Sequence, residues 1–193
     1  METTKLSEIN IFKVSVPNWK DKKEEVLSLA PTEHLLPEDN SRTYSDYHYT
    51  EDMKRRTFNG TYRFSDGTGS HPYANAFFNM IDFKPHLIFG GGEGDYICTD
   101  LWCMRYVENG GVHVHDHGSG MSGILYADYD PVYQSATTFI SPVRKIWDGY
   151  TINYTPEVEE GDMILFPSQL AHYSKANTHS KDRVIFSFNI RVG

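Results

Sequence analysis

The sequence predicts a mainly β protein of the sandwich or jelly-roll kind, with helices from its N-terminal part packed against it. From Tyr96 onward, short strand-like runs alternate with turn residues at fairly regular spacing. The 193 residues, of which 39% are hydrophobic and 14% aromatic, are enough to bury one sizeable core. We therefore expect a single domain, with accessory helices and a strand in residues 1–95 and the β core in residues 96–193.

The N-terminal part is expected to contribute one strand and two short helices. Ile9–Val16 alternates like a strand and ends at Pro17. A Lys- and Glu-rich helix should follow from about Trp19 to Leu29, with Asn18 as its candidate N-cap. A second short helix is expected at Ala74–Ile81.

The predicted core follows a glycine-rich break at Gly90–Gly94. Its expected strands are Tyr96–Val107, Gly111–His117, Met121–Tyr126, Ala136–Ile140, Thr151–Tyr154, Asp162–Pro167 and Arg183–Val192. In the last strand, alternation sorts the side chains into two faces. One face is apolar and predicts a core face (Val184, Phe186, Phe188 and Ile190). The other is mostly polar, and it predicts either a pocket lining or the exposed face of an edge strand (Arg183, Ile185, Ser187 and Asn189).

Two cysteines, Cys98 and Cys103, are too few for a disulfide scaffold. We interpret them as reduced, small core side chains. On a regular strand their odd spacing would turn them to opposite faces.

Charge and hydropathy exclude several kinds of partner. The net charge of -8 disfavours nucleic acid, which binds basic surfaces. No apolar run is long enough to cross a bilayer, and the polar N-terminus does not resemble a secretory signal. We expect a cytoplasmic protein that acts on a small molecule or a peptide; whether it is a monomer or a homodimer is left open.

The run Gly110–Gly118 contains three histidines at alternate positions, His113, His115 and His117. On a strand they share one face, and neighbours at i and i+2 lie roughly 6–7 Å apart, close enough to share one metal ion. His113 and His117 are about twice as far apart, so the metal pair is His113 with His115 or His115 with His117. We favour the second pair, because Gly118–Gly120 follows directly and would open the site to solvent.

A fourth histidine, His172, can complete such a site. Gly161-Asp162 predicts a turn, Met163–Phe166 a buried strand, and Pro167 its end. His172 would lie just beyond that strand end. Antiparallel sandwiches bring distant strands face to face, so His172 can meet His115, although by itself it could equally be a surface-loop histidine.

Taken together, these segments resemble the 2-oxoglutarate/Fe(II) oxygenases of phages and bacteria, relatives of the prolyl 4-hydroxylases. The resemblance covers roughly the C-terminal half. It is carried by His115-Asp-His117, Ser122-Gly-Ile-Leu-Tyr126, Gly161-Asp162, Phe166-Pro-Ser-Gln-Leu-Ala-His172 and Arg183-Val-Ile-Phe-Ser-Phe-Asn189.

The resemblance implies a double-stranded β-helix that binds Fe(II) and 2-oxoglutarate. His115, His117 and His172 would be the metal ligands, with His113 and Asp116 as alternates. Arg183 would hold the distal carboxylate of the cosubstrate, and Ser187, Asn189 and Tyr126 would complete its pocket. The implied reaction hydroxylates an unidentified substrate while 2-oxoglutarate becomes succinate and CO2.

One feature departs from the superfamily pattern of two histidines and one carboxylate. No acidic residue follows any of the three clustered histidines at the second position. Asp116 is adjacent, and alternation turns it away from the metal face. Either the site uses three histidines, or a local bulge swings Asp116 inward.

Two other interpretations compete. Gly161, Pro167 and His172 also resemble the second motif of cupin-type metal-dependent dioxygenases and isomerases, although Gln169 replaces a glycine and Asn177 falls one position late. The other alternative is a non-catalytic jelly-roll structural protein, which the missing carboxylate would favour. Binding of 2-oxoglutarate would distinguish the oxygenase from a cupin-type enzyme. Formation of succinate would distinguish the oxygenase from a non-catalytic jelly-roll protein.

Overall fold

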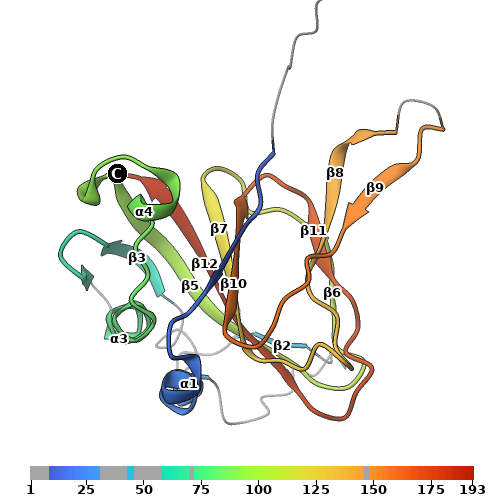
Figure 1. The fold of residues 1–193 in the computed structure, drawn as a ribbon, viewed down its shortest axis with the longest axis horizontal. Coiled ribbons are helices and arrows are strands. Elements are labelled where there is room, and N and C mark those ends of the chain that lie inside the picture. The colour runs from blue at the N-terminus through green and yellow to red at the C-terminus, as the bar shows by residue number, and fades with distance from the viewer. Residues whose placement is uncertain (1–8, 31–42, 46–57, 70–71, 146–147) are drawn as a thin grey trace, which may run out of the picture.

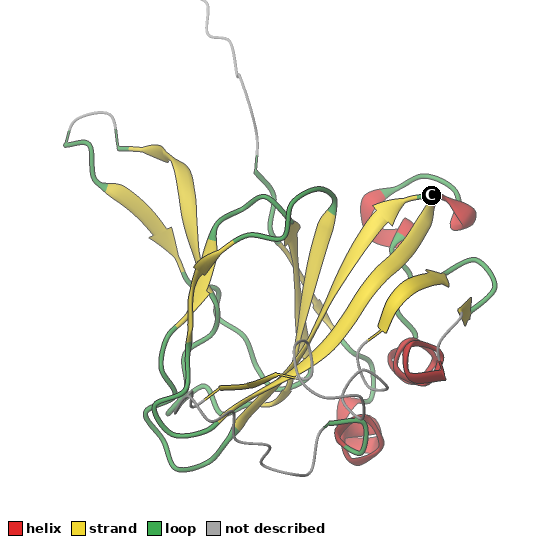
Figure 2. Ribbon diagram, turned by 180° about the vertical axis from the view of Figure 1, so that it is seen from behind, coloured by secondary structure: helices red, strands yellow, loops and turns green. Residues whose placement is uncertain are grey.

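The computed structural model describes residues 9–30, 43–45, 58–69, 72–145 and 148–193. In it, two antiparallel sheets face each other, and helices cover the outer face of the larger one (Figures 1 and 2). The mainly β jelly roll predicted from the sequence is confirmed. Among the described residues, no helix is both long and apolar enough to cross a membrane.

The larger sheet combines strands from both halves of the chain. In spatial order it contains β1 (Phe12–Ser15), β10 (Asp162–Pro167), β7 (Met121–Asp128), β12 (Arg183–Val192), β5 (Tyr96–Tyr106), β3 (Phe58–Arg63) and β4 (Thr68–Gly69), with β2 (Thr43–Ser45) also paired to β5. The smaller sheet is ordered β6 (Val112–His115), β11 (His172–Ser174), β8 (Thr138–Arg144) and β9 (Thr151–Tyr154). Except for the consecutive pairs β3–β4 and β8–β9, neighbouring strands are distant in sequence, so each sheet brings together side chains from separate motifs.

The helices are short. They are α1 (Trp19–Leu27), α3 (Pro72–Ile81), α4 (His86–Phe89) and the 3-10 turn η1 (Glu93–Asp95). Asn18 stands at the start of α1, but its backbone is left-handed, with φ 54°, and its side chain forms no cap hydrogen bond. The capping role expected for Asn18 is therefore wrong.

The larger sheet is buried on both faces, which is one of the two arrangements that the alternation in β12 allowed. On the outer face, Phe77 and Phe78 of α3 pack on Phe186 and Phe188, with ring centroids 5.0 and 5.3 Å apart. On the inner face a second apolar cluster fills the space between the sheets. It contains Tyr106, Ile124, Tyr126, Phe139, Ile164, Phe166 and Ile185. β12 is thus a central strand, and its polar side chains face the interior.

A β-bulge in β5 corrects one prediction. Asn189 pairs with Asp100 and Ile190 with Cys98, so Thr99 is an extra residue between them. Such a bulge reverses the alternation of side chains beyond it. Cys98 and Cys103 consequently lie in the same outer core cluster, both buried and both free thiols. The expectation of opposite faces was wrong, while that of small core side chains is confirmed.

Candidate metal centre

Three histidines converge between the sheets. His115 ends β6, His117 lies just beyond it, and His172 begins β11 directly opposite His115 in the strand register. The ring nitrogens available as ligands all lie within 4.8 Å of one another. The ring centroids are 4.4 Å apart for His115 and His172 and 4.9 Å for His117 and His172. This spacing can hold one metal ion.

Hydrogen bonds orient each of the three rings. Nδ1 of His115 donates to the carbonyl of His113 at 2.8 Å, and Nδ1 of His172 donates to the carbonyl of Leu170 at 2.8 Å. Nδ1 of His117 lies 3.1 Å from Oδ1 of Asn189. With Nδ1 carrying the proton in each ring, the lone pair is on Nε2. Metal-bound histidines are held in this way, because the second nitrogen fixes the tautomer and the ring orientation.

Burial keeps the two inner histidines uncharged. It lowers the pKa of His172 to about 4, an effect that His115 and His117 reinforce. Burial also lowers the pKa of His117, against the opposing effect of its bond to Asn189. A neutral imidazole is the form that binds a metal, so these rings need not lose a proton near pH 7.

Hydrogen bonds connect His117 through Asn189 to Asp100, a carboxylate that the sequence analysis did not identify. Nδ2 of Asn189 donates to Oδ2 of Asp100 at 3.2 Å, and Thr99 donates to the same oxygen at 2.7 Å. Ser122 donates to Oδ1 of Asn189 at 2.8 Å. Asp100 faces Asn189 across the β5–β12 pair. Only knowledge of that register could have revealed the link.

The two alternate ligands lie outside the cluster. His113 is exposed and contributes only its backbone carbonyl, to His115. Asp116 is exposed, and its Oδ1 accepts a hydrogen bond from the N–H of Gly118 at 3.2 Å. The bulge that would have turned Asp116 inward is not observed. Among the described residues, the groups that could hold a metal are the three histidines alone.

Arg183 is a buried cation that forms no ion pair within the described part of the chain. It is 1% exposed, and its guanidinium lies 4.1 Å from the ring centroid of Tyr106. It donates to the backbone carbonyls of Ser135 and Lys175, while its Nε has no partner among the described residues. A buried charge is costly unless it is paired. The unused donor therefore fits an anionic ligand.

A small cavity lies beside the three histidines. Its volume is about 40 Å³, and it is lined by His115, His117, His172, Trp102, Met104, Tyr106, Val112, Ile124, Thr137, Ser174, Ile185 and Ser187. Ser187 thus lines the space predicted for the cosubstrate. Tyr126 does not line it, and its hydroxyl instead accepts a hydrogen bond from the N–H of Thr137 at 3.0 Å. Arg183 lies behind Tyr106, and Asn189 is bonded to His117.

The facing sheets and the histidine cluster define a jelly-roll protein with a candidate metal centre. Residues 100–189 match a family model described as "Putative 2OG-Fe(II) oxygenase". This segment contains the three histidines, Asp100, Arg183 and Asn189. The resemblance predicted from the sequence is confirmed over this segment. This match and the histidine cluster indicate an oxidoreductase that uses Fe(II) and 2-oxoglutarate, the cofactors that the sequence predicted.

Solved structures show the same fold. HygX from Streptomyces hygroscopicus, crystallised with nickel, 2-oxoglutarate and hygromycin B, is 10% identical with a TM-score of 0.61, over 95% of this chain and 83% of that one. A Pseudomonas putida prolyl-4-hydroxylase is 12% identical with a TM-score of 0.56, over 96% and 94%.

A third similar structure, a 2OG-Fe(II) oxygenase-family oxidoreductase from Burkholderia pseudomallei, is 11% identical with a TM-score of 0.48, over 62% of this chain and 56% of that one. No curated protein matches the chain in sequence. At these identities the likeness to HygX and the prolyl-4-hydroxylase establishes the fold, and the histidine site itself must supply the argument for function.

Proposed function

We propose that the chain is a single-domain oxygenase that binds Fe(II) and 2-oxoglutarate and hydroxylates a small-molecule or peptide substrate. The main support is the histidine cluster, in which each Nδ1 is hydrogen-bonded and each Nε2 is available. HygX and the prolyl-4-hydroxylase suggest the two kinds of substrate, since one was crystallised with hygromycin B and the other is named for prolyl residues. The two cysteines are buried free thiols, which supports a reducing compartment such as the cytoplasm.

His115, His117 and His172 would hold the iron. Three protein ligands leave coordination positions open, as an oxygenase requires. When bound, Fe(II) and 2-oxoglutarate supply the oxidation: one atom of O2 enters succinate, CO2 leaves, and the other atom hydroxylates the substrate. The protein keeps the rings neutral and fixed in orientation, and Phe139 and Phe166 pack against His172 and keep water from that side.

Arg183 would hold the distal carboxylate of 2-oxoglutarate. Its unpartnered Nε and its burial support this role. The cavity of about 40 Å³ has space for only about three water molecules, each of which needs roughly 10–15 Å³ of such space, so the five-carbon cosubstrate requires a side chain to move. Tyr106 is the natural candidate, because it both lines the cavity and covers the guanidinium.

Ser187 would add a hydroxyl to this pocket. Tyr126 and Tyr129 stand close enough to Arg183 for its charge to act on them: burial raises the pKa of both phenols, and the cation opposes that effect. Asn189, first expected in the cosubstrate pocket, we assign instead to holding His117.

Succinate formation without substrate tests this proposal. Wild-type protein with Fe(II), O2 and 2-oxoglutarate should release succinate slowly, and Arg183→Gln should lose that activity. Arg105→Gln is the matched control, because Arg105 also lies on the larger sheet but is paired with Asp182 at 3.1 Å. Equal succinate formation by the three proteins would contradict the role of Arg183. No succinate from iron-loaded wild type would favour the cupin-type or non-catalytic alternatives.

A further inference from the structure

A groove at the mouth of the sandwich has no assigned role. It has a volume of about 410 Å³ and is lined by Ile9, Asn10, Ile11, Phe139, Ser141, Ile152, Tyr154 and Leu170. We call it the hairpin groove, because β8 and β9 form one of its walls. Its size falls within the range of about 300–1,000 Å³ that is usual for small-molecule sites.

None of the described residues that line the hairpin groove is charged, although the protein carries a net charge of -8. The contrast with a larger cavity of about 510 Å³ is informative, because Lys13, Glu157 and Glu159 line that one. An uncharged, apolar wall cannot compensate the desolvation of a charged ligand. The hairpin groove therefore selects for neutral chemistry.

Strand register places the hairpin groove beside the histidines. His172 pairs with Phe139, and Phe139 pairs with Tyr154, so the three side chains share one face of the smaller sheet. Neighbouring strands are about 4.8 Å apart, which puts Tyr154 roughly 10 Å from His172 across the sheet. The Phe139 ring is 5.9 Å from the His172 ring, and the Leu170 carbonyl accepts the Nδ1 hydrogen bond of His172. Two groove residues thus contact a metal-ligand candidate directly.

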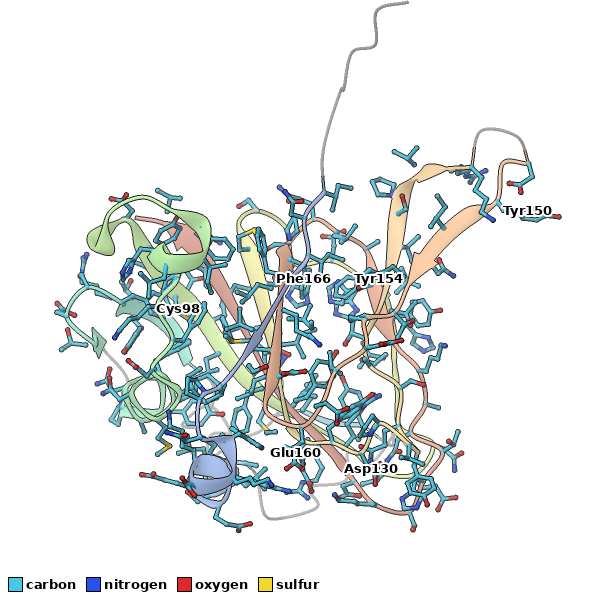
Figure 3. The ribbon with its side chains drawn as sticks, viewed as in Figure 1. Cys98, Asp130, Tyr150, Tyr154, Glu160 and Phe166 are labelled. Carbon is cyan, nitrogen blue, oxygen red and sulfur yellow. The ribbon has the colours of Figure 1, made fainter. Side chains whose placement is uncertain are left out.

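Apolar side chains in the hairpin groove are left in contact with water. Ile9 is 43% exposed, Ile152 41% and Tyr154 54%. Figure 3 labels Tyr154 where the hairpin joins the sandwich and Tyr150 near its tip. Covering these surfaces with an apolar ligand would contribute about 25 cal/mol for each Å² removed from water.

We propose that the hairpin groove seats an uncharged, apolar part of the substrate, and that Ile152 and Tyr154 determine substrate specificity. This inference rests on the proposed function, since it assigns the groove to the substrate of the iron centre. The occupant is a neutral molecule, or a neutral side chain of a larger one, held against Phe139, whose ring packs on His172. Charged isosteres of the same size are rejected.

Three size-matched probes test the chemistry: benzamide (neutral), benzoate (anionic) and benzylammonium (cationic). Binding is followed on Zn(II)-loaded protein with 13C-labelled isoleucine methyl groups, where Ile9, Ile11 and Ile152 report on the groove. Benzamide should shift these methyl signals, and the charged probes should bind at least about tenfold more weakly. Ile152→Asp should weaken benzamide binding by a similar factor. Leu87→Asp, a change at an exposed residue of α4, should leave it unchanged.

Replacing Zn(II) by Mn(II) tests the position of the groove. The paramagnetic ion should speed the relaxation of bound benzamide protons in wild type and much less in Ile152→Asp. Any one of three results would overturn the proposal. The charged probes could bind as tightly as benzamide, the three methyl signals could fail to shift, or bound benzamide could show no faster relaxation. None of these readouts depends on 2-oxoglutarate, so a failed succinate assay with intact benzamide binding would refute the proposed function separately.

Discussion

Protonation of His172 should make the metal-free protein unstable in mild acid. Burial lowers the pKa of His172 from its ordinary value of 6.5 to about 4. The unfolded chain therefore binds a proton between these values that the folded protein does not. A depressed folded-state pKa contributes stability that is complete above pH 6.5 and is lost as the pH falls towards 4. Over the whole window the loss approaches roughly 3 kcal/mol, because one pKa unit corresponds to about 1.4 kcal/mol.

At pH 5 the linkage relation gives roughly 2 kcal/mol of lost stability from this residue, compared with almost none at pH 7. Urea unfolding of the protein in EDTA at the two pH values measures the change. His172→Gln should reduce the pH dependence by about that amount, since the amide does not titrate. His113→Gln, a change at an exposed histidine, is the control and should retain the wild-type dependence. An unchanged pH dependence in His172→Gln would refute the claim that this imidazole is buried and neutral.

Further changes test the surroundings of the site. Asp100→Asn removes the charge that is hydrogen-bonded to Asn189 and should weaken metal binding by about 10–100-fold without unfolding the protein. Competition with a fluorescent chelator measures the affinity. An unchanged affinity would mean that the carboxylate has no influence on the metal. Gly123→Ala would place a Cβ 2.2 Å from Cζ of Phe188, and urea unfolding should show a loss of roughly 1–3 kcal/mol; a neutral result would mean that this core adapts easily. His113→Ala should leave the metal stoichiometry unchanged, because only its backbone carbonyl takes part, and loss of the metal would restore His113 as a ligand.

Much of the fold was predicted from the alternation of apolar and polar side chains and from the positions of turn residues. The pattern of β12 predicted an apolar core face, because side chains on a strand alternate strictly. For the opposite, polar face the pattern allowed either a pocket lining or an exposed edge, and the structure shows that it faces the interior. Thr151–Tyr154, Asp162–Pro167 and Arg183–Val192 were predicted with the bounds that the structure shows. β11, with three residues, was missed, since so short a run has no detectable period.

The parts of the site whose residues are close together in the sequence could be predicted. The contacts that depend on how distant strands pair could not. The spacing of His115 and His117 predicted a shared metal, and the structure places His172 beside them. The link from Asn189 to Asp100 depends on the pairing of β5 with β12, which no local pattern encodes. The bulge at Thr99 similarly reversed the expected facing of the cysteines.

The proposed function requires the histidines and Arg183 to bind Fe(II) and 2-oxoglutarate together. The most direct test is anaerobic titration of 2-oxoglutarate into Fe(II)-loaded protein, followed through the visible charge-transfer band of the chelate. We expect the band in wild type and in Arg105→Gln, and expect it to be lost or much weaker in Arg183→Ala. If iron binds through His115 and His172 but no band forms in wild type, 2-oxoglutarate is not the cosubstrate and a cupin-type activity becomes the leading account.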